Sequence, residues 1–188
     1  HMQHLLYSPA SLRFYRYYQY VDDAFHEAFM LKLNELKRYL GDKAHSADSV
    51  CLVKSGVLGA CGIRMPNDMD FITASRRFSK SDLRESIGDG TSGILVDTMA
   101  DYSVNVPTLS VSTSELLEDS KRHFLFHGIK FADLNHVYVH KSICGRPHDR
   151  DDLVRVRKHI RKARKAIPSR FLREELLWLE TGVRQGFQ

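Results

Sequence analysis

Two aspartates separated by one residue, Asp68 and Asp70, are the side chains of this sequence best suited to chemistry. They open an apolar segment, Asp68-Met69-Asp70-Phe71, with the alternation of a β-strand. Because residues i and i+2 of a strand share a face, both carboxylates should point the same way, with Met69 and Phe71 in the core. Adjacent carboxylates repel each other unless a cation lies between them, and Mg²⁺ favours such oxygen ligands. The pair therefore predicts a magnesium site.

A glycine-rich segment precedes the two aspartates. Residues Val50 to Val53 are expected to form a strand, which leads into a loop with three glycines in the seven residues from Gly56 to Gly62. Glycines let backbone N–H groups approach an anion closely, as in phosphate-binding loops. An isolated Asp-x-Asp is common in solvated turns. The order of strand, glycine loop and strand-borne carboxylates instead favours a site for a metal and a phosphate.

The segment from Ser55 to Asp70 resembles the signature of the nucleotidyltransferase superfamily with the DNA polymerase β-like fold. In that signature a strand leads into a Gly-Ser turn, and a second strand carries Asp-x-Asp; here Gly56 precedes Asp68 by twelve positions, although Ser55 comes before the glycine. The resemblance implies an α/β (α+β) fold with a mixed, twisted sheet flanked by helices. It also implies Mg²⁺ as cofactor and transfer of a nucleotidyl group from a nucleoside triphosphate to an acceptor.

A second resemblance leaves other functions open. Ser55-Gly56-Val57-Leu58-Gly59-Ala60 is similar to the Gly-Thr-Leu-Leu-Gly-Ala opening of the LicD and fukutin branch, but the Trp-Asp-Asp-Asp that normally follows is missing. Members of that branch transfer phosphorylated alcohols from CDP-activated donors, which implies a phosphotransferase in surface-polysaccharide or glycan assembly. A third alternative is a non-catalytic module that binds a nucleotide or a partner.

The superfamily resemblance implies roles for individual residues. Asp68 and Asp70 would hold the metal and act in catalysis, and a third carboxylate on a later strand would act as general base or help to hold the metals. Asp97, in the apolar strand expected at 93–99, is the candidate, with Asp101 as the alternative; a solvated strand end explains Asp97 equally well. The residues expected to neutralise or contact the donor's phosphates are Ser55, Gly56, Gly62, Arg64 and Lys130.

The C-terminal half resembles a second pattern. Bacterial nucleotidyltransferase-like proteins, including domains found in surface-polysaccharide loci, follow the catalytic sheet with a helix bearing Lys, then Arg, then a basic residue beside two acids. The positions that fit are Lys141, Arg146, Arg150, Asp151 and Asp152. A capped helix start, with Asp149 or Asp151 as N-cap, explains the same acids.

Hydrophobic spacing and capping residues predict the elements that position these groups. The expected helices are at 25–40, 79–88, 112–117 and 133–141, and a strand or hairpin is expected at 123–131 with a bend at Gly128. The expected divisions of the chain are an N-terminal segment at 1–21, the nucleotidyltransferase-like domain at 22–153 and a basic helical part at 154–188. Since His1-Met2 resembles a cleaved tag, we expect the chain to belong to a larger polypeptide.

Composition limits the partners. The 188 residues carry a formal charge of +5 and a pI near 9.1, which suits a nucleotide, a nucleic acid or a phosphorylated glycan. The basic stretch at 155–165 can follow a nucleic-acid backbone, but a solvated helix face is the commoner meaning of such a run. The apolar residues around Trp178 suit docking back on the domain or a homodimer.

Cysteine and histidine usage predicts no second metal centre. The three cysteines lack a Cys-x-x-Cys spacing, so they indicate neither a disulfide framework nor a zinc site and favour the cytoplasm. His136 and His140 are spaced as i and i+4, which suits a transition metal, but no third ligand accompanies them. No apolar run approaches the roughly 20 residues of a transmembrane helix.

Overall fold

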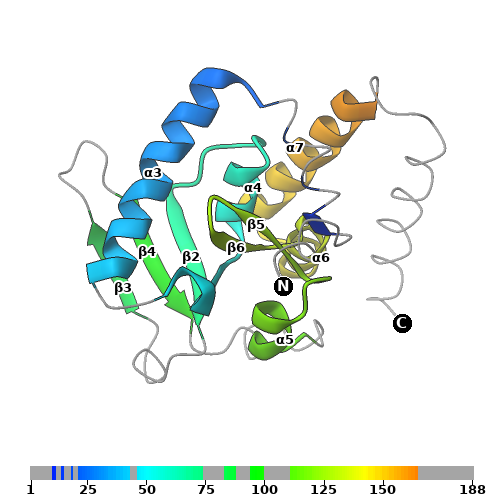
Figure 1. Ribbon diagram of the computed structural model, residues 1–188. Helices are drawn as coiled ribbons and strands as arrows, with labels where there is room; N and C mark the ends of the chain where they lie inside the picture. Colours follow the sequence, from blue (N-terminus) through cyan, green and yellow to red (C-terminus); the bar gives the residue numbers. More distant parts are fainter. Residues whose placement is uncertain are drawn as a thin grey trace.

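The computed structural model describes residues 10, 11, 14, 18, 21–42, 46–73, 83–87, 94–99 and 111–164, and for 83–87 and 94–99 it describes the backbone. Within these residues six strands form one sheet in the order β3-β4-β2-β1-β6-β5 (Figure 1). The strands are β1 (Val50–Leu52), β2 (Asp68–Thr73), β3 (Leu83–Ile87), β4 (Ile94–Met99), β5 (His123–Phe126) and β6 (Ile129–Ala132). The pairs β1/β6 and β2/β4 are parallel and the other neighbouring pairs are antiparallel. The expected mixed sheet is confirmed.

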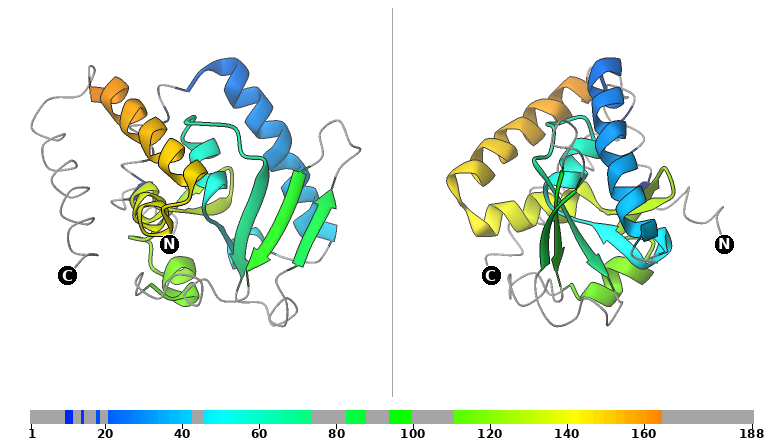
Figure 2. Two further views of the ribbon diagram at one scale, coloured as in Figure 1. Left: turned by 180° about the vertical axis from the view of Figure 1, so that it is seen from behind. Right: turned by 90° about the vertical axis from the view of Figure 1, so that its left-hand side faces the viewer.

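Helices flank this sheet, as expected for an α/β protein. They are α3 (Asp23–Asp42), the 3₁₀ helix η1 (Ala47–Ser49), α4 (Ser55–Ala60), α5 (Thr113–Glu118), α6 (Leu134–Cys144) and α7 (Pro147–Arg164). In the right-hand view of Figure 2, α3 lies on one side of the sheet and α6 and α7 lie on the other. In the described part of the chain, no helix combines the length and the apolar character needed to cross a membrane.

Local signals fix several helix ends. The Asp22 carboxylate accepts a hydrogen bond from the backbone N–H of Phe25 at 3.1 Å, so Asp22 caps α3, which starts at Asp23. Ser112 and Glu115 form a capping box at the start of α5. Gly145 ends α6 with a φ of 61°, a left-handed conformation that glycine adopts without strain.

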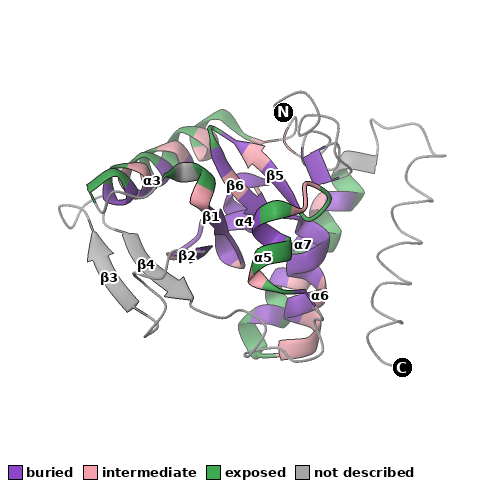
Figure 3. Ribbon diagram, turned by 60° about the horizontal axis from the view of Figure 1, so that its bottom comes forward, coloured by how far each residue is buried: buried purple, intermediate pink, exposed green. Residues whose placement is uncertain are grey.

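The core lies between α3, the central strands and α4. Phe29, Leu33, Leu36 and Leu40 of α3 are buried, as is every residue of β1. In Figure 3 the buried colour covers α4 and the central strands, while the outer face of α3 is exposed. A shell of stacked aromatic rings extends this core to β5 and β6; the ring centroids of Phe14 and Phe124 lie 4.1 Å apart, and those of Phe124 and Phe131 lie 5.4 Å apart.

The glycine-rich segment is not the expected loop. Residues Ser55–Ala60 form helix α4, and Gly56 and Gly59 are buried within it. A Cβ atom at Gly59 would lie 2.5 Å from a ring carbon of Phe29 and 2.8 Å from Cδ of Pro66, closer than real Cβ contacts allow. Gly59 therefore serves close packing of α4 against α3, and the expectation of a loop was wrong for Ser55–Ala60, which are helical.

The helix expected at 79–88 was also wrong where the structure describes it. Residues Leu83–Ile87 form strand β3, which pairs with β4 along its whole length. Ladder hydrogen bonds to a neighbouring strand outweighed the weak local signal of a cap and a terminal glycine.

Helix α7 begins earlier than the capping residues suggested. α7 starts at Pro147, a residue well suited to the first helical position, so Asp149 and Asp151 lie inside its first turns rather than at its N-cap. The helix passes through the expected boundary at 153/154 without a break. Residues 165–188, including Trp178, lie outside the described residues.

Candidate functional site

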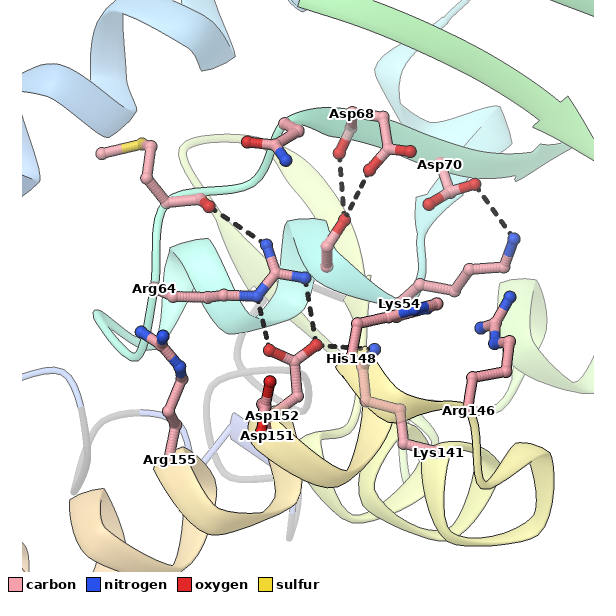
Figure 4. Close-up of a pocket in the computed structure, with 13 residues that line it drawn as sticks. Lys54, Arg64, Asp68, Asp70, Lys141, Arg146, His148, Asp151, Asp152 and Arg155 are labelled. Atoms are coloured by element: carbon pink, nitrogen blue, oxygen red, sulfur yellow. Dashed lines mark hydrogen bonds and ion pairs between the residues drawn. The ribbon is translucent and has the colours of Figure 1, made fainter.

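A pocket of about 680 Å³ opens between the start of β2 and the ends of α6 and α7 that face it (Figure 4). Its lining is strongly charged. The acidic lining residues are Asp68, Asp70, Asp151 and Asp152, and the basic ones are Lys54, Arg64, Lys141, Arg146 and Arg155. Ser55, Met65, Asn67 and His148 complete the lining. A concave, highly polar site of this kind suits a charged ligand.

Strand β2 places both predicted carboxylates in this pocket, as the i, i+2 spacing predicted. The alternate residues Met69 and Phe71 are fully buried on the other face. Ser55 positions Asp68, because its hydroxyl donates to Asp68, 3.0 Å from Oδ1 and 3.1 Å from the backbone carbonyl oxygen. The start of α4 and the start of β2 are thereby tied together at the site.

Asp70 is paired with a lysine that the sequence analysis did not identify. The Lys54 ammonium lies 3.0 Å from Asp70 Oδ1, and the side chain of Asp70 is only 5% exposed. Lys54 adopts φ 50° and ψ −123°, a conformation that a non-glycine residue rarely takes. It directly precedes α4, so its side chain enters the pocket at the turn between β1 and α4.

Arg64 is held by a carboxylate from a distant part of the sequence. Its Nε and an Nη lie 2.5 and 3.0 Å from the two Oδ atoms of Asp152 on α7, a bidentate arrangement. The hydrogen bond to Asp152 raises the pKa of Arg64 above its usual value, while burial opposes the rise. The ion pair of Arg64 with Asp152 therefore joins the segment preceding β2 to α7.

Lys141 of α6, which lines the pocket, belongs to the same network. Its ammonium lies 2.9 Å from Asp149 and 2.8 Å from Asp152, and all three side chains are less than 5% exposed. Arg146 also binds Asp149, with Nε 2.6 Å from Oδ2. Burial raises the pKa of Asp149, but the hydrogen bonds from Arg146 and Lys141 outweigh it and bring the pKa to about 2. These helices are thus fastened to each other by ionised groups.

The structure brings most of the predicted site residues together. The pocket lining contains Ser55, Arg64, Asp68, Asp70, Lys141, Arg146, Asp151 and Asp152. Gly56, Gly62, Lys130 and Arg150 are not among its lining residues.

Three of these four residues have other structural roles. Gly62 has a φ of 70°, and a Cβ there would lie 2.5 Å from Val21, so it serves the turn after α4. Lys130 donates to the carbonyl oxygens of Asp48 and Leu117, both at 2.8 Å. Arg150 donates to the carbonyl oxygen of Gly145 at 3.2 Å.

The candidate third carboxylate is placed by its backbone. β4 runs parallel to β2, and Asp97 is the register partner of Asp70. Asp101 lies outside the described residues.

Sequence reasoning missed Lys54, Asn67, His148, Arg155 and the anchoring role of Asp149. Two of them carried a usable signal. Lys54 directly precedes the Ser55-Gly56 motif, and Arg155 is one α-helical turn after Asp151 and Asp152.

Asp68 and Asp70 fit a magnesium ion whose coordination shell is completed by water and substrate. Among the described residues, no group of three or more His, Cys, Asp and Glu side chains could hold a metal on its own. Mg²⁺ commonly takes only one or two carboxylates and fills its other positions with water and substrate phosphates. A pair of carboxylates on the wall of a roomy, cation-lined pocket meets that requirement.

His136 and His140 lie outside the pocket lining and are buried on α6. Burial lowers the pKa of His136 to about 3 and that of His140 to about 4, so both imidazoles are neutral at physiological pH.

No family model, curated protein or solved structure matches this chain.

Proposed function

We propose that this protein is a magnesium-dependent nucleotidyltransferase that transfers a nucleotidyl group from a nucleoside triphosphate to an acceptor. The observation that carries the proposal is the joint placement of Asp68 and Asp70 on one wall of a pocket that also presents Lys54, Arg146 and Arg155. Carboxylates suit the metal, and the cations suit the phosphates of the donor. A nucleotide offers both groups in one ligand.

The order of the strands supports the same proposal. The nucleotidyltransferase superfamily, which the Ser55–Asp70 segment resembles, places a third carboxylate on a strand beside the first two. Here β4 lies next to β2, and Asp97 is in register with Asp70. We therefore assign Asp97 the role of the third acid, as general base toward the attacking hydroxyl or as a further metal ligand.

Each part of the pocket has a separate task in this proposal. Asp68 and Asp70 would hold the metal, and Ser55 would keep Asp68 oriented through its hydroxyl. The chemistry supplied by Mg²⁺ held there would be stabilisation of the charge that develops on the attacking and leaving oxygens. Arg146 is half exposed and Arg155 is exposed; both line the pocket, so their guanidinium groups would bind the outer phosphates.

Calorimetric titration tests the proposal. ATP, CTP, GTP, UTP and CDP-ribitol are each titrated with and without Mg²⁺ into the wild type, the Asp68→Asn/Asp70→Asn variant and an Asp42→Asn control. Asp42 is exposed at the end of α3 and does not line the pocket. We expect a nucleoside triphosphate to bind only with Mg²⁺, and the double variant to lose at least about tenfold in affinity, since charged hydrogen-bonding and metal contacts are lost.

Other results select the alternatives. A preference for CDP-ribitol over every triphosphate would favour a phosphotransferase that uses a CDP-linked donor. Equal binding of one ligand by the wild type and the double variant would refute the metal site and leave a non-catalytic binding module.

A further inference from the structure

Lys54 contacts one of the two proposed metal ligands directly. Its ammonium lies 3.0 Å from Asp70 Oδ1, with the lysine side chain 25% and the aspartate side chain 5% exposed (Figure 4). Asp70 is further fixed because its carbonyl oxygen accepts a hydrogen bond from the backbone N–H of Val53 at 2.9 Å. The ammonium is therefore a cation already in place beside the carboxylate that the metal needs.

The backbone of Lys54 indicates that this side chain matters. At φ 50° and ψ −123° a residue with a Cβ is strained, whereas glycine adopts such a conformation readily. Its side chain makes no capping hydrogen bond to α4. The side-chain contact that the structure gives Lys54 is the one between its ammonium group and Asp70.

An ammonium and a divalent cation compete at Asp70. Each favours the ionised carboxylate, and two cations side by side repel each other unless an anion separates them. A triphosphate supplies that anion, because its oxygens can accept from the ammonium while they also bind the metal. Lys54 lines the pocket, so its ammonium can turn from Asp70 toward a ligand there.

We propose that Lys54 is an internal counter-ion that occupies the cation position at Asp70 in the ligand-free protein and moves to the donor's phosphates when metal and nucleotide bind together. This inference rests on the proposed function. It makes metal binding weaker without the triphosphate than with it, because the metal alone must displace the ammonium without offering it a new partner. By linkage, triphosphate and metal each strengthen the binding of the other.

Removing the ammonium should change two affinities in opposite directions. We expect Lys54→Met to bind Mn²⁺ alone about tenfold more tightly than the wild type, because one positive charge next to the ligand is gone. The same variant should bind the preformed complex of Mn²⁺ with inorganic triphosphate about tenfold more weakly, because the phosphates lose a charged donor. Lys54→Arg retains the charge and should stay near the wild type in both measurements.

Electron paramagnetic resonance of free Mn²⁺ measures the first affinity, and calorimetry measures the second. Lys121→Met is the matched control, since Lys121 is exposed and lies outside the pocket lining. Lys54→Gly is a second variant that removes the ammonium and also relieves the backbone strain. It should show the same two shifts in affinity, and it provides the test if Lys54→Met folds poorly.

The outcomes separate this inference from the proposed function. If Asp70→Asn loses Mn²⁺ while Lys54→Met and Lys54→Gly bind Mn²⁺ as the wild type does, or more weakly, the carboxylate site stands and the counter-ion role is refuted. If Asp70→Asn binds Mn²⁺ as tightly as the wild type, the metal site itself is refuted. Opposite shifts of the two affinities in both Lys54 variants would support the inference.

Discussion

Replacement of Lys141 by methionine tests how the helices beneath the pocket are held. Lys141 is 4% exposed, and its ammonium binds Asp149 and Asp152, which are 0% and 3% exposed. Removing one partner of a buried ion pair costs about 3–5 kcal/mol, because it leaves a buried charge uncompensated. Arg146 still binds Asp149, and Arg64 still binds Asp152. We therefore expect a loss near the lower end of that range.

Urea unfolding followed by circular dichroism measures this loss through linear extrapolation of the free energy of unfolding. A loss of about 3 kcal/mol corresponds to a melting temperature lower by about 6–12 °C for a chain of this size. Lys121→Met removes the same charge from an exposed position and should change the free energy of unfolding by less than about 0.5 kcal/mol. A double replacement, Lys141→Met with Asp149→Asn, should lose less than the sum of the two single losses because the residues interact.

A loss below about 1 kcal/mol in Lys141→Met would refute the reasoning. It would mean that the two aspartates are compensated by Arg146 and Arg64 alone, or that water reaches them once the lysine is removed. Additive effects in the double variant would lead to the same conclusion, since additivity means that the two groups do not stabilise one another.

Two further predictions concern packing and pH. Gly59→Ala should destabilise the protein by about 1–2 kcal/mol, since the clash of the new Cβ with Phe29 outweighs the gain in helix propensity. Gly41→Ala should be neutral or stabilising, because nothing lies within 4 Å of a Cβ at that position. Urea unfolding measures the stability of both variants, and a Gly59→Ala protein as stable as the wild type would contradict the packing described for Gly59. Because the pKa values of His136 and His140, about 3 and about 4, lie below the ordinary 6.5, the unfolded chain takes up protons first and stability should fall as the pH drops from about 6.5 toward 4. The drop between pH 7 and pH 5 should shrink in His136→Gln/His140→Gln, and an unchanged drop would exclude these histidines as its cause.

Much of the local structure could be predicted from the sequence. The capping box at Ser112 and Glu115, the αL glycine at 145 and the hairpin that bends at Gly128 depend on residues a few positions apart. The alternation at 68–71 also predicted that Asp68 and Asp70 would face one pocket, because side-chain direction in a strand follows from the backbone alone.

The tertiary structure decided the features that depend on distant partners. Gly59 is helical and buried because Phe29 and Pro66 lie against it, a crowding that no window around the glycine reveals. Residues 83–87 are a strand because β4 supplies the hydrogen bonds.

The pocket itself depends on contacts across the chain. Arg64 and Asp152 are 88 positions apart, and Lys54 and Asp70 are 16 apart. From charge and residue type alone, the carboxylates were predicted to hold a metal and the cations to contact the phosphates of a ligand. Only the packing of α6 and α7 against the start of β2 determined which of these charges pair with each other and which charged side chains line the pocket, because electrostatic pairing depends on distance and burial rather than on order along the chain.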